Sequence, residues 1–142
     1  MSKRNEIFIS IKSELQKIPN VRIETHLQKI EDTEKFPWIG LHSLTERKSF
    51  AASAGPAGRQ SILEILALVY VRAEEPISAL NSVIDAVEAN IEDDPTLGKE
   101  YPVFARVAEI SLLATSSEIA ESAGGFYGIA EILIEVNYRY ER

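Results

Sequence analysis

Hydrophobic residues alternate with mainly polar ones near the end of the chain. The apolar positions are Ala130, Ile132, Ile134, Val136, Tyr138 and Tyr140, and those between them are Glu131, Leu133, Glu135, Asn137 and Arg139. A period of two predicts a strand of antiparallel sheet, half buried against a core. The second face is mixed, because Leu133 interrupts the polar series. Such a face can pair with a copy of itself, and Leu68, Tyr70 and Leu112 are candidates for similar outer faces.

Two other segments carry apolar residues at helical spacing. Ile7, Ile11, Leu15 and Ile18 recur at steps of four, four and three until Pro19 ends the helix. The second helix begins at Pro76, because proline suits a first helical position. Its apolar stripe consists of Ile77, Leu80, Val83, Ile84, Val87 and Ile91.

Four further segments are predicted to be strands. They are Val21 to Leu27, a strand entered through Phe36-Pro37-Trp38, the largely apolar segment Ile62 to Arg72, and a strand from about Val103 to Ser116. The order is therefore α-β-β-β-α-β-β. We predict one α+β domain over residues 1–142, in which an antiparallel or mixed sheet of about five strands packs both helices on one face.

Periodicity disappears between Thr45 and Gln60, where Ser, Ala, Gly and Pro dominate. The sequence predicts a flexible loop over residues 45–60, which is long for a connection inside a domain and typical of a functional or a disordered segment. The candidate interaction residues in this loop are Arg47, Lys48, Phe50 and Arg59. An incidental disordered loop explains the composition equally well.

The net charge of −7 has a definite location. The segment from Glu74 to Glu100 carries eight acidic residues and one basic residue, Lys99, a difference equal to the whole imbalance. An acidic surface repels phosphate backbones, so we expect no sequence-specific nucleic-acid binding. The longest apolar runs are shorter than a membrane-spanning helix requires, and we expect neither a secretion signal nor a membrane partner.

Few residues offer chemistry. The chain has no cysteine, which excludes disulfides, thiolate metal sites and cysteine nucleophiles. Phosphate-loop, nucleophile-elbow and zinc-helix motifs are absent from the sequence. His26, His42 and Glu24 can in principle converge on a metal, but surface histidines without ligand geometry explain them better. We therefore expect no catalytic residue, no cofactor and no metal, and hence no enzyme.

The order of elements resembles that of the tail-terminator or tail-completion proteins of long-tailed bacteriophages, the family of the lambda terminator. The resemblance covers nearly the full chain and rests on the opening helix followed by Pro19-Asn20-Val21, the Phe36-Pro37-Trp38-Ile39 entry, the insertion before Ile62, the helix starting at Pro76, and the closing Val136-Asn137-Tyr138-Arg139-Tyr140. No single motif in it is specific.

The resemblance implies a non-enzymatic virion protein. Such a protein forms a hexameric ring on the head-proximal end of the tail tube, stops tube polymerisation and presents a surface to the neck. Its partners are then copies of itself, the tail tube protein and a neck or head-completion protein. It resides in the virion tail, and in the host cytoplasm during assembly. The alternatives are another head–tail joining protein and a non-enzymatic adaptor that binds a peptide along a strand edge.

Overall fold

Two helices and five strands make up the described part of the chain. The computed structural model describes residues 2–49, 58–116 and 126–141. The elements are α1 (Lys3–Leu15), β1 (Arg22–Glu24), a short 3-10 helix (Ile30–Asp32), β2 (Trp38–Ser49), β3 (Gly58–Ala73), α2 (Pro76–Asp93), β4 (Val103–Ser116) and β5 (Phe126–Glu141). The predicted order α-β-β-β-α-β-β and the α+β class are confirmed.

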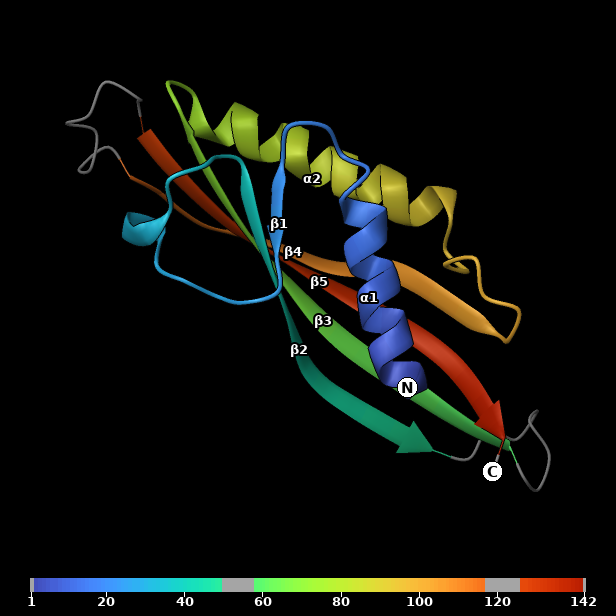
Figure 1. Cartoon of the computed structure of the whole chain (residues 1–142). Coiled ribbons are helices and arrows are strands. Elements are labelled where there is room, and N and C mark those ends of the chain that lie inside the picture. The colour runs from blue at the N-terminus through green and yellow to red at the C-terminus, as the bar shows by residue number, and fades with distance from the viewer. Residues whose placement is uncertain (1, 50–57, 117–125, 142) are drawn as a thin grey trace.

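The strands form one mixed sheet in the order β1-β2-β3-β5-β4. β1 runs parallel to β2 over three residues, whereas β2, β3, β5 and β4 are successively antiparallel. β3 and β5, at 16 residues each, are the longest strands and lie in the middle of the sheet. Figure 1 shows the long strands crossing the molecule with both helices on the same side of them.

One face of the sheet is buried under the helices. The stripe of α1 contributes Ile7, Ile11 and Leu15, and every second residue of β5 from Ala130 to Tyr138 joins the same cluster. α2 adds Leu80, Val83, Ile84, Val87 and Ile91. Burial of these aliphatic side chains is the main source of stability, at about 1.5–3 kcal/mol for each fully buried large side chain.

Local signals fix the helix ends. The Ser2 hydroxyl accepts a hydrogen bond from the Asn5 amide at 3.2 Å and so caps α1. α1 ends at Leu15, before Pro19, and Asn20 takes a positive φ of 63°, a conformation that asparagine tolerates. α2 starts with Pro76, as the sequence predicts.

Two boundary predictions are corrected. The strand predicted over Val21 to Leu27 is restricted to Arg22–Glu24, because only these residues pair with β2. The loop predicted over residues 45–60 is shorter: β2 continues to Ser49 and β3 begins at Gly58. Residues 45–49 of β2 pair with residues 60–64 of β3 in an antiparallel ladder. Composition alone does not reveal this pairing. Residues 50–57 lie outside the described part of the chain.

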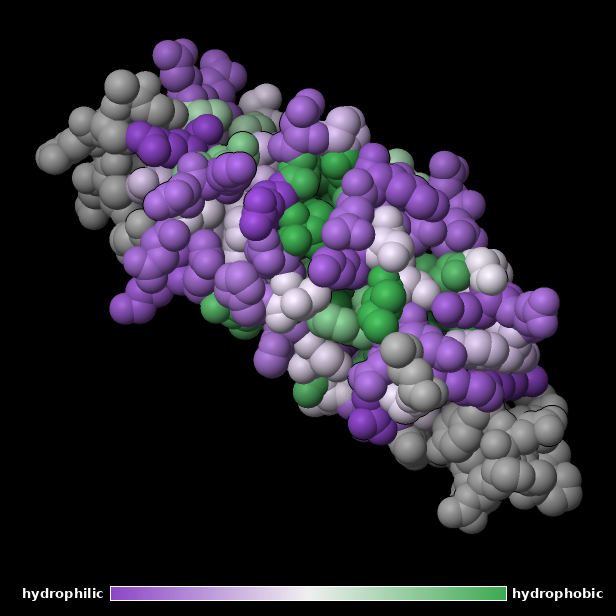
Figure 2. Space-filling view, in the orientation of Figure 1, coloured by the Kyte–Doolittle hydropathy of each residue, from purple (hydrophilic) through white to green (hydrophobic). Residues whose placement is uncertain are grey.

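The helix-bearing surface is mainly hydrophilic. Figure 2 shows hydrophobic residues on this side as small islands between polar ones. In the described residues, neither helix has the length and apolar character needed to cross a membrane.

Candidate functional site

The second face of the sheet is left without an α-helix in the described part of the chain. Residues directly opposite one another in a ladder share a face. The register therefore places on this uncovered face Ile62, Glu64, Leu66, Leu68 and Tyr70 of β3 and Ile129, Glu131, Leu133, Glu135 and Asn137 of β5. All of them except the buried Tyr70 are partly exposed. Such a face, on which five aliphatic residues lie beside three carboxylates, is suited to contact with another protein surface.

A pair of carboxylates crosses the middle of the uncovered face. Glu64 of β3 lies directly opposite Glu135 of β5, an arrangement that is unfavourable for like charges. Each carboxylate has a partner: Arg106 Nη2 of β4 contacts Glu135 Oε1 at 2.8 Å, and the Thr45 hydroxyl donates to Glu64. The two carboxylates are thus each stabilised by a donor from a neighbouring strand, β2 for Glu64 and β4 for Glu135.

Aromatic side chains close one end of this face. The Trp38 and Tyr70 rings stack at 5.0 Å with an interplanar angle of 19°, and the Tyr70 hydroxyl donates to the backbone oxygen of Gln28. Ile30 packs on the same pair. The segment that links β1 to β2 therefore covers the sheet here, and no other segment of the described residues forms a helix or strand over the rest of the face.

Gly40 makes this closure possible. A Cβ placed on Gly40 would lie 2.4 Å from the Trp38 ring and 2.5 Å from the backbone oxygen of His26. Real Cβ atoms do not approach other atoms so closely, and a backbone oxygen cannot swing away as a side chain does. Glycine is thus required where the chain after β1 crosses over β2.

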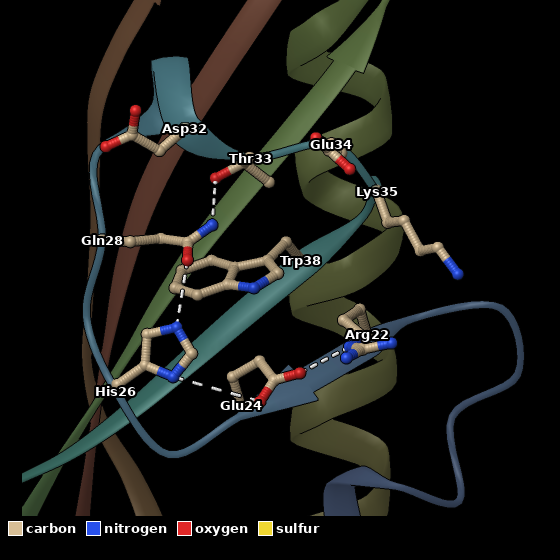
Figure 3. A pocket seen from close by; sticks show the side chains of 9 residues that line it. All are labelled: Arg22, Glu24, His26, Gln28, Asp32, Thr33, Glu34, Lys35 and Trp38. Atoms are coloured by element: carbon tan, nitrogen blue, oxygen red, sulfur yellow. Dashed lines mark hydrogen bonds and ion pairs between the residues drawn. The ribbon is translucent and has the colours of Figure 1, made fainter.

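A polar cavity of about 380 Å³ opens beside Trp38. Its side chains form a chain of contacts around the indole ring (Figure 3). Gln28 Nε2 donates to Thr33 Oγ1 at 2.8 Å, and Gln28 Oε1 lies 3.0 Å from His26 Nε2. His26 Nδ1 lies 4.0 Å from a Glu24 oxygen, and Glu24 also pairs with Arg22.

The polar side chains of this cavity form a surface network of ion pairs and hydrogen bonds. The hydrogen bond and charge of Arg22 keep the pKa of Glu24 below its usual value, although partial desolvation opposes them. Glu24 is therefore ionised at neutral pH. Because Gln28 Nε2 donates to Thr33, Gln28 Oε1 is the atom that accepts from His26 Nε2–H. These contacts fasten the segment between β1 and β2.

Two of the three residues considered for a metal site lie close together, and the third lies elsewhere. His26 and Glu24 come together, whereas His42 lies on β2 and does not line the cavity. Across residues 2–49, 58–116 and 126–141, no group of three His, Asp or Glu side chains is arranged to hold a metal ion.

The predicted interaction residues fall at the end of the β2–β3 hairpin. Arg47 is exposed and lies opposite Ile62, on the uncovered face. The backbones of Lys48 and Arg59 belong to β2 and β3, where they pair with Ser61 and Tyr140. Phe50 lies outside the described residues. The structure thus places Arg47, Lys48 and Arg59 on strands and not in a loop. Arg47 does not line the Trp38 cavity.

Periodicity misplaced one candidate and missed its neighbours. Leu112 lies opposite Ala130, on the helix side of the sheet and not on the uncovered face. The reason is an irregularity in the register between Val107 and Glu109, which inserts one residue and inverts the alternation beyond it. Ile110, Leu112 and Leu113 remain exposed along edge strand β4. The run of adjacent leucines is the signal that could have identified this site.

The acidic segment is mainly α2 and its C-terminal turn. Asp85, Glu92 and Asp93 are exposed on α2, and the helix carries no basic residue. The interpretation of this segment as a solvated acidic surface is consistent with that exposure.

Comparisons with known proteins give little guidance. No protein-family model matches the chain, and no curated protein matches it. Among solved structures, the chain is similar to one described as "Virion of native gene transfer agent (GTA) particle", with 10% identity and a TM-score of 0.43 over 98% of this chain and 100% of that one. A likeness at this level does not by itself establish a shared function.

Proposed function

We propose that this chain is a structural, non-enzymatic protein of a phage-like virion that forms a ring on the head-proximal end of a tail tube. In this role it ends tube polymerisation and offers a surface for attachment of the head or neck. The partners are further copies of the chain, the tail tube protein and a neck protein. The resemblance in element order, from the opening helix to the final strand, supports this assignment.

The observation that carries the proposal is the uncovered sheet face, together with the two unlike edges of the sheet. Leu66 and Leu133 lie directly opposite each other on this face, next to the Glu64–Glu135 pair. A ring needs one patch that meets a different patch on the next copy. An open mixed face and two unlike strand edges supply surfaces of that kind.

Deletion of the gene in the producing phage or particle tests this role. We expect particles with tube lengths that vary widely and with tails not joined to heads, as seen by electron microscopy. Expression of the chain in trans restores both properties. Tails of normal length joined to heads in the deletion strain would contradict the proposal.

A peptide-binding adaptor is the second candidate. It is favoured by the edge of β4 that no strand of the described residues covers, because strand edges accept extended peptides. Light scattering together with a binding assay on purified tail tubes separates the two. An adaptor stays monomeric at high concentration and binds a foreign peptide, whereas a ring protein associates with itself or with the tube end.

A further inference from the structure

We propose that the free edge of β4 in one copy pairs with the free edge of β2 in a second copy, in antiparallel orientation. This inference rests on the proposed ring and specifies which two surfaces meet. It commits to a second copy of this chain as the occupant of both edges.

Both edges are open over long stretches. β4 pairs with β5 on one side, and no strand of the described residues pairs with it on the other. β2 pairs with β1 at residues 38–40, so its edge is unoccupied from Leu41 to Ser49 among the described residues. Unpaired strand edges of this length present rows of backbone donors and acceptors.

Strand direction makes the two edges compatible. β2, β3, β5 and β4 alternate in direction, so β2 and β4 run opposite ways. A second copy placed beside the first by rotation brings its β2 antiparallel to β4 and continues the alternation of the sheet. Pairing of β4 with β4 would instead close a two-fold dimer and end growth.

The side chains along the two edges are complementary. Arg47 of β2 and Glu109 of β4 are both exposed and both lie on the uncovered face, by their register opposite Ile62 and Leu133. A contact of unlike edges brings these opposite charges to the same side of the joined sheet.

Apolar groups occur on both edges as well. Leu112 is 53% and Leu113 51% exposed on β4, and Leu44 is 47% exposed at a register irregularity of β2. Their removal from water favours association. Arg47 and the irregularity at Leu44 also discourage indiscriminate pairing of the β2 edge, so the contact selects its partner.

Engineered cysteines test the contact, because the chain has none of its own. Ser111→Cys lies on the uncovered face of β4, and His42→Cys, Thr45→Cys and Arg47→Cys sample that face along β2. Each variant is purified alone, checked for native circular dichroism, and mixed in concentrated solution under mild oxidation. We expect Ser111→Cys to cross-link with one β2 variant in preference to the others.

The controls are the single variants by themselves. Dimers of Ser111→Cys alone that exceed the mixed product would show that β4 meets β4 and would overturn the proposal. Absence of a mixed cross-link both in concentrated solution and in particles assembled with the variants would also overturn it.

A charge placed on the edge gives an independent readout. Leu112→Lys is expected to weaken self-association roughly tenfold or more in sedimentation velocity, because the ammonium group must be desolvated at the contact. Ile9→Lys is the matched control, since Ile9 is 48% exposed on α1. Equal weakening by both variants would refute the assignment of the edge.

The two proposals fail separately. Normal head-joined tails in the deletion strain would refute the terminator role and leave edge pairing intact if the mixed cross-link forms. Normal capping by Leu112→Lys, together with absence of the mixed cross-link, would refute edge pairing and leave the terminator role standing.

Discussion

The two faces of β5 show how one strand serves two purposes. Ile132, Ile134 and Val136 are fully buried under the helices, whereas Leu133 and Glu135 between them stay partly exposed on the uncovered face. The backbone is the same, so the difference lies in what covers each side. The covered face holds the domain together, and the uncovered face is free to carry residues chosen for a contact.

This contrast predicts very different costs for neighbouring substitutions. Ile134→Ala removes buried methyl groups and leaves a cavity, and we expect a loss of about 2–5 kcal/mol in the free energy of unfolding. Leu133→Ala, one residue away on the uncovered face, should cost less than about 1 kcal/mol. Urea denaturation of the two variants measures the difference. Similar losses would show that the uncovered face is covered in solution.

Substitution of Gly40 tests the packing where the segment after β1 crosses over β2 and covers one end of the uncovered face. Gly40→Ala pushes a methyl group into the Trp38 ring and the His26 backbone, so we expect a loss of about 1–3 kcal/mol. Trp38 is the one tryptophan of the sequence, so its fluorescence should shift as the ring leaves its buried position.

The matched control is Gly98→Ala. Gly98 has a positive φ of 67° and open space around its Cβ position, so alanine there is strained without a collision. We expect it to lower stability without changing the Trp38 emission. A shift of emission in Gly98→Ala, or none in Gly40→Ala, would contradict the proposed packing.

The sequence predicted the covered face far better than the uncovered one. Alternation from Ala130 to Tyr138 and the stripe from Ile7 to Leu15 identified the core, because burial selects apolar residues at a regular spacing. The end of β2 and the start of β3 were predicted as part of a loop over residues 45–60, because the strands near Ser49 and Gly58 gain their structure from pairing and not from composition.

The exposed edge of β4 and the Trp38 cavity escaped prediction for a related reason. The irregularity after Val107 inverts the alternation of β4, and nothing in the local sequence announces it. The Trp38 cavity depends on a crossing of the chain at Gly40, which joins residues from separate segments. Such features follow from tertiary contacts, which a single sequence does not display.

The charged row of the uncovered face predicts a smaller effect that depends on salt. Arg106→Gln leaves Glu135 opposite Glu64 without its cation, and we expect a loss of about 0.5–1 kcal/mol at low ionic strength. The loss should shrink at high salt, because mobile ions screen exposed charges. Arg106→Lys should recover part of it. A loss that does not change with salt would mean that Arg106 acts through packing of its stem.

A loss of similar size is expected at the margin of the covered face, where Tyr101 packs against the core. Its hydroxyl donates to Glu6 Oε2 at 3.2 Å, and Lys3 Nζ lies 4.8 Å from its ring centre. Tyr101→Phe keeps the ring beneath Lys3 and removes one partly buried hydrogen bond, so we expect a loss of about 0.5–1 kcal/mol near pH 8.

Measurements at alkaline pH isolate the contribution of the Tyr101 hydroxyl to stability. Burial, together with the hydrogen bond to Glu6, raises the pKa of Tyr101 from 10.0 to about 12. The unfolded chain therefore releases the proton first, so the contribution of Tyr101 to stability is complete below pH 10 and declines as the pH rises toward 12. Other tyrosines titrate in both proteins and cancel in the difference. The advantage of the wild type over Tyr101→Phe, measured by urea denaturation from pH 8 to 11, should fall above pH 10, and a constant difference would show that the hydroxyl is solvated in the folded state.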